Sequence, residues 1–330
     1  MTTPRKLLVD SEVALCYHIS SKCVRGMWLC GQRKRRSYEH RKTWLQQRLL
    51  CLAEAFAIDV LSYAIMSNHF HLIVYYEPLA SQGWSDEEVV ERWLQVYPPR
   101  NDKHYERRKE RLLGDVEEVA KLRAVLGDLS GFMKHLKQPI ARRMNREDGV
   151  RGHAFDERFY SGALLNEDSV LTSMRYVELN PVRARIAHTL EQVKHTSAQR
   201  HIEAAAHNEA DLEAYLEPVV SGTRSRHSGV RRGPHPALAG MSLGSYLRLL
   251  REALECERLV RSTQRCTEAQ ASKAENWRQR VQLLKKRQRA YGDPQQLQHW
   301  LGKRSVGMAD RKSTRLNSSH SQQSRMPSSA

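Results

Sequence analysis

The 330-residue chain contains 54 lysine and arginine residues against 37 aspartate and glutamate residues, which gives a formal net charge of +17. Its hydrophobic residues, 40% of the total, are sufficient to bury the core of one large domain or two. No segment approaches the ~18 consecutive apolar residues of a membrane span. Residues 1–12 lack the apolar stretch of a signal peptide, so we expect a cytoplasmic protein with no membrane partner.

The excess positive charge is concentrated in four separate runs. They are residues 31–42, 100–112, 134–146 and 224–233. Basic runs with interleaved aromatic and amide side chains favour binding to phosphate backbones, whereas the alternative is a solvated surface or a flexible basic linker. The side chains that we expect to contact DNA are Arg33, Lys34, Arg35, Arg36, Lys134, Lys137, Arg142, Arg143 and Arg146.

The beginning of the chain predicts strands around a single helix. Residues 13–24 are rich in β-branched and aromatic side chains and predict a first strand. Ser37 can cap the helix that follows, whose apolar residues recur at helical spacing. Residues 58–66 and 69–76 are then expected to form a hairpin across residues 67–68. This order of elements indicates an α+β sandwich.

The next part of the chain predicts three helical segments and one more strand. Residues 85–126 are charged and helical in pattern, which indicates an insertion beside the core, and residues 129–146 form a further amphipathic helix. Residues 153–165 are expected to be a fourth strand. Asn166 is a good N-cap for the next helix, which should end where Pro181 disfavours helical geometry in the residue before it.

Two histidines lie at the centre of the predicted hairpin. Because side chains alternate along a strand, His69 and His71 point to the same face, together with Ile73 and Tyr75. Two imidazoles spaced in this way can bind one metal ion. Chance alone gives about 0.7 such pairs for 15 histidines in 330 residues, so the spacing also fits a strand end with satisfied imidazoles.

The helix that begins after Asn166 carries a phenol and an amide near its end. Tyr176 and Asn180 are four residues apart and so lie on one helix face, about 40° from each other. The two groups therefore project together from a helix that is expected to pack on the sheet. Taken singly, Tyr176 could be a core tyrosine and Asn180 a residue that ends the helix.

Four segments, in this order and spacing, carry a resemblance to a known family. They are CYHISSKCVRG, YAIMSNHFHLIV, RGHAFDERFYSGALL and RYVELNPVRA. With them, the chain resembles the REP-associated tyrosine transposases, in the HUH single-tyrosine transposase superfamily of bacterial insertion sequences. The resemblance covers about residues 10–200.

The resemblance implies a ferredoxin-like α+β sandwich with an antiparallel sheet. It assigns His69 and His71 as paired metal ligands and Tyr176 as the nucleophile that attacks a DNA phosphodiester. Asn180 occupies the position of an amide ligand, which in related enzymes is often glutamine. We expect the ion to be Mg²⁺ or Mn²⁺. The expected partner is single-stranded or hairpin DNA in the bacterial nucleoid, with a homodimer as one option.

The implied reaction is metal-dependent cleavage and rejoining of single-stranded DNA in DNA transposition. A phosphotyrosine intermediate conserves the energy of the broken bond, so neither step needs ATP. Two alternatives stay open: a domesticated protein that binds hairpin DNA or RNA without cutting, and another HUH nicking endonuclease. The presence of His69, His71, Tyr176 and Asn180 argues against the first, and the single tyrosine before the NPVRA sequence argues against the second.

The remaining chain divides into three parts. Residues 201–236 are polar and end in a Gly-, Ser- and Arg-rich linker, and residues 237–309 form a helical accessory region, either DNA-binding or a packing appendage. Residues 310–330 back-translate, in one frame, to a common sequencing-adapter read, and we interpret them as an assembly artefact. Without them the net charge is +14, so the prediction of a nucleic-acid partner does not depend on them.

Overall fold

A computed structural model describes Val9 and residues 14–33, 36–99, 101–156, 158–207, 210–224, 233–238, 240–260 and 267–302. Within these ranges, the side chains of residues 33, 207, 210 and 211 are not described. The centre of the predicted linker, the end of the predicted accessory region and the whole of residues 310–330 lie outside them. No helix of the described residues has the length and apolar character needed to cross a membrane.

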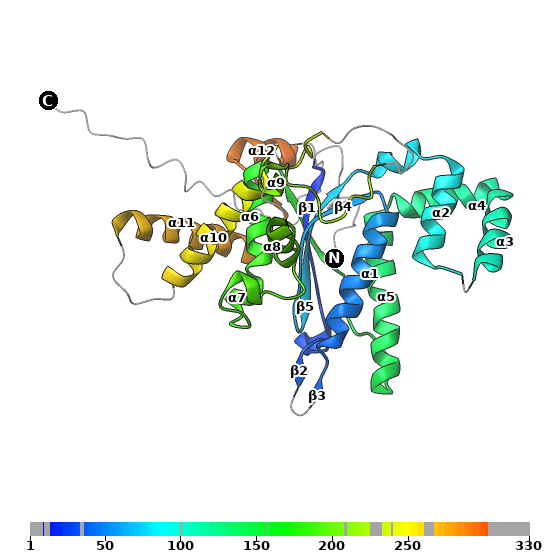
Figure 1. Cartoon of the computed structure of the whole chain (residues 1–330), viewed down its shortest axis with the longest axis horizontal. Coiled ribbons are helices and arrows are strands. Elements are labelled where there is room, and N and C mark those ends of the chain that lie inside the picture. The colour runs from blue at the N-terminus through cyan, green and yellow to red at the C-terminus, as the bar shows by residue number, and fades with distance from the viewer. Residues whose placement is uncertain are drawn as a thin grey trace.

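A five-stranded sheet forms the centre of the molecule (Figure 1). In spatial order its strands are β4 (Ile58–Ile65), β5 (His69–Tyr76), β1 (Cys16–Lys22), β6 (Tyr160–Leu164) and β7 (Ala290–Tyr291). The hairpin of β4 and β5 was predicted correctly, and the α+β class is confirmed. Strand β1 is shorter than the predicted residues 13–24, because a 3₁₀ turn, η2 (Val24–Gly26), begins soon after Lys22. Strand β6 is shorter than the predicted residues 153–165, because the described residues before it form a loop.

The expectation of an antiparallel sheet is wrong for its last strand. The four strands from β4 to β6 pair antiparallel, but β7 pairs parallel to β6 and makes the sheet mixed. A long helical crossover separates β6 from β7, and such a crossover can bring the chain back in the same direction. A separate two-stranded hairpin, β2 (Gln32–Arg33) and β3 (Arg36–Ser37), precedes the first helix.

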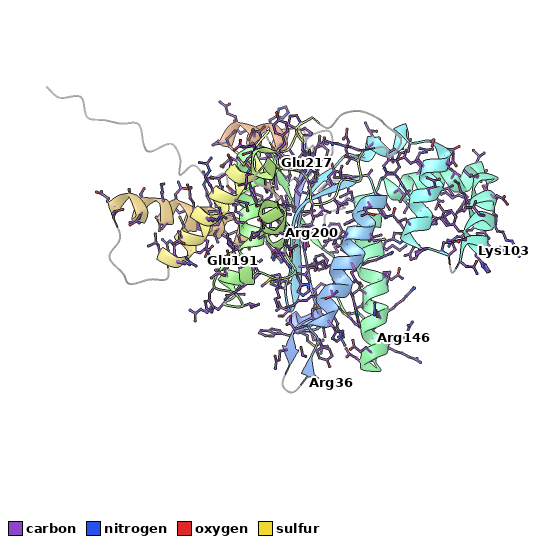
Figure 2. The ribbon with its side chains drawn as sticks, in the orientation of Figure 1. Arg36, Lys103, Arg146, Glu191, Arg200 and Glu217 are labelled. Carbon is purple, nitrogen blue, oxygen red and sulfur yellow. The ribbon has the colours of Figure 1, made fainter. Side chains whose placement is uncertain are left out.

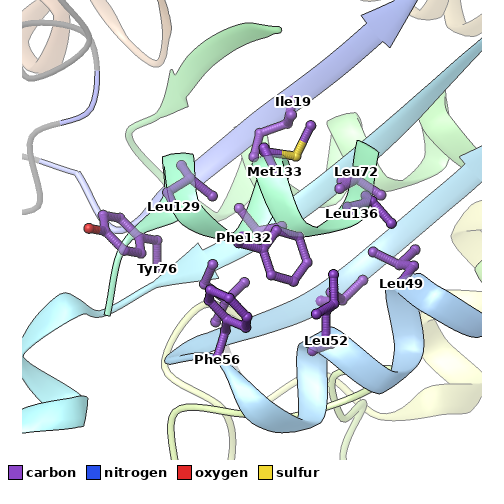
Figure 3. Packing of buried hydrophobic residues seen from close by; sticks show 14 of the residues in the cluster. Ile19, Leu49, Leu52, Phe56, Leu72, Tyr76, Leu129, Phe132, Met133 and Leu136 are labelled. Atoms are coloured by element: carbon purple, nitrogen blue, oxygen red, sulfur yellow. The ribbon is translucent and has the colours of Figure 1, made fainter. Parts of the chain in front are cut away.

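One face of the sheet is covered by α1 (His40–Ala55) and α5 (Leu129–Asp148). Figure 3 shows Leu49 and Phe132 from these helices packed over Leu72 of β5. The cluster of buried apolar residues on this side is called the α5-side core. The alternating pattern of β5 dictates it, since every second residue of the strand points to this face.

The charged segment beside the core folds into three helices. They are α2 (Asp86–Val96), α3 (Asp102–Leu113) and α4 (Val116–Leu126), and a short 3₁₀ segment, η3 (Pro78–Gly83), leads into them. Ser85, Asn101 and Asp115 each accept a backbone N–H at the start of these helices, which satisfies donors that would otherwise have no partner. Leu94 and Leu126 are buried in the α5-side core, so the helices pack at its edge.

The opposite face of the sheet carries α6 (Glu167–Glu178) and α10 (Leu243–Leu259), with buried apolar residues that form the α6-side core. Asn166 caps α6, as the sequence predicts, and the structure adds a reciprocal capping box with Ser169. The helix stops at Glu178, before the predicted end at Asn180, and Pro181 lies in the first turn of a second short helix, α7 (Asn180–Arg183), where proline is well tolerated. The prediction that Tyr176 and Asn180 share one face of a single helix is therefore wrong, because they lie on successive helices.

Most of the remaining C-terminal elements also pack against this face. They are η4 (Leu190–Gln192), α8 (Ser197–His207), α9 (Ala210–Glu213) and α11 (Glu268–Lys285). The last helix, α12 (Pro294–Gly302), instead buries Trp300 in the α5-side core. Between α9 and α10, Val219 and Val220 form backbone hydrogen bonds with Val60 of β4. Leu250 of α10 and Trp277 of α11 are buried in the α6-side core.

Candidate functional site

The two predicted histidines lie at the start of β5, next to the turn that joins it to β4. His69 is the first residue of the strand and is partly buried, whereas His71 is buried. The two rings lie 5.0 Å apart, centroid to centroid. In the register of the sheet, they face Lys22 and Ser20 of β1. The hairpin therefore places both imidazoles on the α6 side of the sheet, near the end that carries the β4–β5 turn.

A third histidine joins the pair, and sequence reasoning missed it. His18 lies on β1, and its Nε2 is 2.9 Å from Nδ1 of His71. The two rings stack with centroids 5.1 Å apart. His18 is buried, and no described residue makes a hydrogen bond to its Nδ1. The available signal was strand alternation, which puts His18 on the same face as Cys16 and Ser20.

Tyr176 of α6 packs directly against these rings. Its ring centroid lies 5.8 Å from that of His18 and 5.9 Å from that of His71. The Arg183 guanidinium lies over the tyrosine ring, 4.1 Å from its centroid, and donates to the backbone carbonyl of Tyr176. Glu257 of α10 accepts from the same guanidinium at 3.1 Å. The structure thus brings the predicted nucleophile and the histidine pair together within one chain.

The position of Asn180 gives less support to its predicted role than the positions of the histidines and Tyr176 give to theirs. It begins α7 and is buried, and its side-chain Nδ2 has no hydrogen-bond partner among the described residues. A buried amide donor with no partner is costly, and an acceptor such as a phosphate oxygen would satisfy it, whereas a metal ion would bind Oδ1 instead. Its role as a metal ligand stays a prediction.

Burial, with the positive charges around the site, lowers the pKa values of the imidazoles and keeps them neutral. Burial, with further contributions from Arg287 and Arg183, lowers the pKa of His18 to about 3. Burial, Lys22 and Arg287 lower the pKa of His69 to about 4. Burial and the neighbouring histidines hold the pKa of His71 well below its ordinary value. Neutral imidazoles have a lone pair available for a metal ion at neutral pH.

The phenol of Tyr176 responds in the opposite way to its surroundings. Burial raises its pKa, and the positive charges of Arg183 and Arg287 act against that rise. A phenol is a weak nucleophile until its anion is stabilised. The two arginines supply part of that stabilisation, and additional positive charge at the site would favour the phenolate further.

The donors fit a divalent ion only in part. In the described part of the chain, no group of three or more His, Cys, Asp or Glu side chains is placed to hold a metal. His69 Nδ1 lies 2.7 Å from Oδ1 of Asn68, so it donates and leaves Nε2 with a lone pair. If His71 donates from Nδ1 to His18, its Nε2 is also a ligand. Two imidazoles, the Asn180 amide oxygen and substrate oxygens then make a plausible ligand set.

The predicted DNA contacts fall in two places. Lys134, Lys137 and Arg142 line a cavity of about 480 Å³ between α5 and residues 152–159. Phe155 forms part of its apolar wall. These side chains can therefore contact one ligand, and their role in DNA binding stays a prediction.

The remaining predicted contacts lie toward the far end of α5. Arg143 stacks over Trp44, 3.7 Å from its ring centroid. Figure 2 shows Arg36 and Arg146 at the lower end of the molecule, and both residues are exposed. The Arg33 side chain and the residues Lys34 and Arg35 lie outside the described part.

Comparison with known proteins gives one structural neighbour to report. No protein-family model matches the sequence, and no curated protein does. The neighbour is a solved structure of a REP-associated tyrosine transposase bound to a REP hairpin. It is 11% identical in sequence, with a TM-score of 0.35, and the match covers 71% of this chain and 100% of that one. At this level the similarity is a weak structural resemblance.

Proposed function

We propose that this chain is a metal-dependent transposase that cleaves and rejoins single-stranded, hairpin-bearing DNA through a phosphotyrosine intermediate. The observation that carries the proposal is the packing of Tyr176 against His71, with ring centroids 5.9 Å apart on one face of the sheet. Because all of these groups come from one chain, the proposal does not require a homodimer. It includes a ferredoxin-like arrangement of the elements around β1 and the β4–β5 hairpin.

The proposed ligands are His69 and His71 through Nε2, with Asn180 as the third. A Mg²⁺ or Mn²⁺ ion bound there would neutralise charge on a phosphate oxygen and align the phosphodiester. The protein holds the ligand imidazoles in position before an ion binds. Asn68 fixes the tautomer of His69, and His18 contacts His71. Such preorganisation lowers the cost of assembling the reacting groups.

Tyr176 carries out the covalent step. Its phenolic oxygen forms a bond to the phosphorus, and the bond from phosphorus to the 3′ oxygen breaks, so the upstream strand leaves with a 3′-hydroxyl. The proton lost by the phenol balances the one gained by the leaving oxygen. Attack by a free 3′-hydroxyl on the phosphotyrosine reverses the step and releases Tyr176. Arg183, whose guanidinium lies over the ring of Tyr176, stabilises the phenolate.

The basic residues would hold the DNA around this site. Lys134, Lys137 and Arg142 in the α5 cavity, and the predicted cluster at residues 33–36, offer positive charge to the phosphate backbone. Phe155 offers an apolar wall beside them, of the kind that accepts an unpaired base. In a bacterial cell such a protein would work in the cytoplasm, at the nucleoid.

The direct test is a covalent-adduct assay. Hairpin-bearing single-stranded DNA is incubated with the protein and Mn²⁺, and adducts are separated under denaturing conditions. The wild type is expected to form an adduct, and Tyr176→Phe is expected to form none. Tyr215→Phe is the control and should form the adduct like the wild type, because Tyr215 is an exposed phenol outside the candidate site. Loss of the adduct in the control alone would contradict the assignment.

One observation favours a second candidate, a protein that binds hairpin DNA or RNA without cutting. The net effect of the protein on Tyr176 is a raised pKa, with burial as the largest cause. A protonated phenol does not attack a phosphodiester. Tight hairpin binding with no adduct at any Mn²⁺ concentration would support this candidate. An adduct that never rejoins to a 3′-hydroxyl would instead point to a nicking endonuclease.

A further inference from the structure

After α11 the chain returns to the candidate site. This part of the sequence is far along the chain from the segments that carry the histidines and Tyr176. Helix α11 ends at Lys285, and residues 286–289 turn into β7 at the edge of the sheet. Arg287 lies in this turn with a φ of 53°, in the left-handed region that non-glycine residues seldom adopt. A residue other than glycine keeps this backbone conformation only where the surrounding structure holds it.

That support comes from β6 and β7. The Tyr160 hydroxyl donates to the carbonyl of Gln288 and lies 2.8 Å from the Tyr291 hydroxyl. The backbone N–H of Gln288 donates to the Tyr291 hydroxyl at 2.9 Å. The residue next to Arg287 is thus fixed on both its N–H and its carbonyl. The turn is a defined part of the sheet edge, and it sets where the Arg287 side chain can reach.

Arg287 reaches toward the candidate site. Its guanidinium donates to Oγ of Ser20 at 3.0 Å and lies 5.5 Å from the ring centroid of Tyr160. Ser20 is the residue paired with His71 between β1 and β5, and the Tyr160 ring packs against His18. The guanidinium therefore lies over the same face of the sheet as the histidines and Tyr176.

Two arginines face this site, but their donors are used differently. Arg183 is ion-paired to Glu257 and donates to the Tyr176 backbone, so it is engaged within the fold. Arg287 is exposed, and among the described residues it makes no ion pair. A guanidinium has five N–H donors, and the bond to Ser20 leaves others for a ligand. The charge of Arg287 also lowers the pKa of His69 and opposes the rise in that of Tyr176.

We infer that Arg287 is a catalytic residue that binds a non-bridging oxygen of the scissile phosphate. The inference rests on the proposed function and adds to it: the C-terminal segment supplies part of the site. Guanidinium groups suit this task because their planar donors match phosphate oxygens and their charge is permanent. As negative charge accumulates on the phosphate during attack by Tyr176, the contact would strengthen.

The test compares single-turnover rates of adduct formation at saturating hairpin DNA. Arg287→Gln is expected to lower the rate by about 100-fold or more, the usual effect of removing one such donor. Arg287→Lys should recover part of that loss, because it restores the charge without the planar donors. Lys286→Gln is the matched control, since it removes one positive charge from the neighbouring exposed residue, and its rate should stay within about 2-fold of the wild type.

A second substrate distinguishes a contact between Arg287 and the scissile phosphate from general electrostatic attraction of the DNA and from a folding defect. A methylphosphonate at the scissile position is neutral, so it removes the charge that Arg287 would stabilise. With it, the wild type and Arg287→Gln should differ by less than about 3-fold, while a misfolded variant would stay slow on both substrates.

Three results would overturn the inference, and they are distinguishable. Equal rates for the wild type and Arg287→Gln on the natural phosphodiester would remove the role of Arg287 and leave the proposed function standing. The same holds for a loss confined to DNA affinity, with the saturated rate unchanged. Absence of any adduct in the wild type would overturn the proposed function and the role of Arg287 with it.

Discussion

The two faces of the central sheet are built from the same strands and differ in what those strands present. Toward α1 and α5, β5 contributes Phe70 and Leu72, which are buried among apolar side chains. Toward α6, the same strand contributes His69 and His71, and His71 contacts His18 and Tyr176. The first face is closed mainly by apolar packing, whereas the second combines packing with neutral imidazoles and arginines.

The difference shows how one hairpin can serve stability and chemistry at once. Alternation sends successive side chains of β5 to opposite faces, so the apolar set can fix the strand while the polar set stays available. The polar set is costly: His18 Nδ1 and Asn180 Nδ2 are buried with no hydrogen-bond partner among the described residues. Each such group costs about 1–3 kcal/mol, which the apolar face helps to offset.

The largest predicted effect is on the apolar face. Phe132 is buried in the α5-side core, where its ring lies 5.5 Å from that of Phe56. Phe132→Ala should lower the free energy of unfolding by about 3–5 kcal/mol, because it removes buried area and leaves a cavity. Chemical denaturation measures this loss. The adduct rate for each folded molecule should stay unchanged, and a selective loss of that rate would break the division between the faces.

The next effect is the pH dependence of stability that the site histidines impose. Their pKa values in the folded protein lie below the ordinary value of 6.5, at about 3 for His18 and about 4 for His69. Between pH 6.5 and 4 the unfolded chain therefore binds more protons than the folded protein, and stability falls as the pH falls.

The size of this effect is measurable by denaturation at two pH values. Going from pH 7 to pH 5 should cost about 1–2 kcal/mol for each of these buried histidines. The variant His18→Gln should lose less stability over this interval than the wild type, since it has one histidine fewer to protonate on unfolding. An identical loss in both proteins would show that His18 is not held neutral by the fold.

A smaller effect concerns the contact between His18 and His71, whose nitrogens are 2.9 Å apart. His18→Gln should weaken Mn²⁺ binding by about 10- to 100-fold, the usual result of removing a partner that orients a metal-binding histidine. Isothermal titration calorimetry measures the affinity. His188→Gln, a histidine on the exposed surface, is the control and should bind Mn²⁺ like the wild type. Equal affinities for His18→Gln and the control would show that His18 acts only in packing.

Local patterns predicted much of the fold correctly. The β4–β5 hairpin and the cap of α6 at Asn166 follow from alternation, helical spacing and capping, which depend on neighbouring residues. The pairing of Tyr176 with the histidines followed from the resemblance, and the structure places them together. The hairpin and the cap are each encoded within a few residues of sequence, whereas the contact between Tyr176 and His71 joins segments more than 100 residues apart.

The features that sequence reasoning missed depend on contacts between distant segments. His18 is a single histidine in a buried strand, and nothing beside it in the sequence marks its contact with His71. Arg287 approaches Ser20 across 267 positions of the chain. Strand β7 has only two residues, too few to show a periodic pattern, and its parallel pairing made the sheet mixed.

The most direct test of the account is the ligand environment of bound Mn²⁺, because it does not depend on activity. Pulsed electron paramagnetic resonance detects the nitrogens of imidazoles bound to the ion. The wild type should show two imidazoles, and His69→Gln and His71→Gln should each show one, while His18→Gln keeps two. A spectrum without imidazole nitrogens, or one that neither substitution at His69 or His71 changes, would contradict a metal site beside Tyr176.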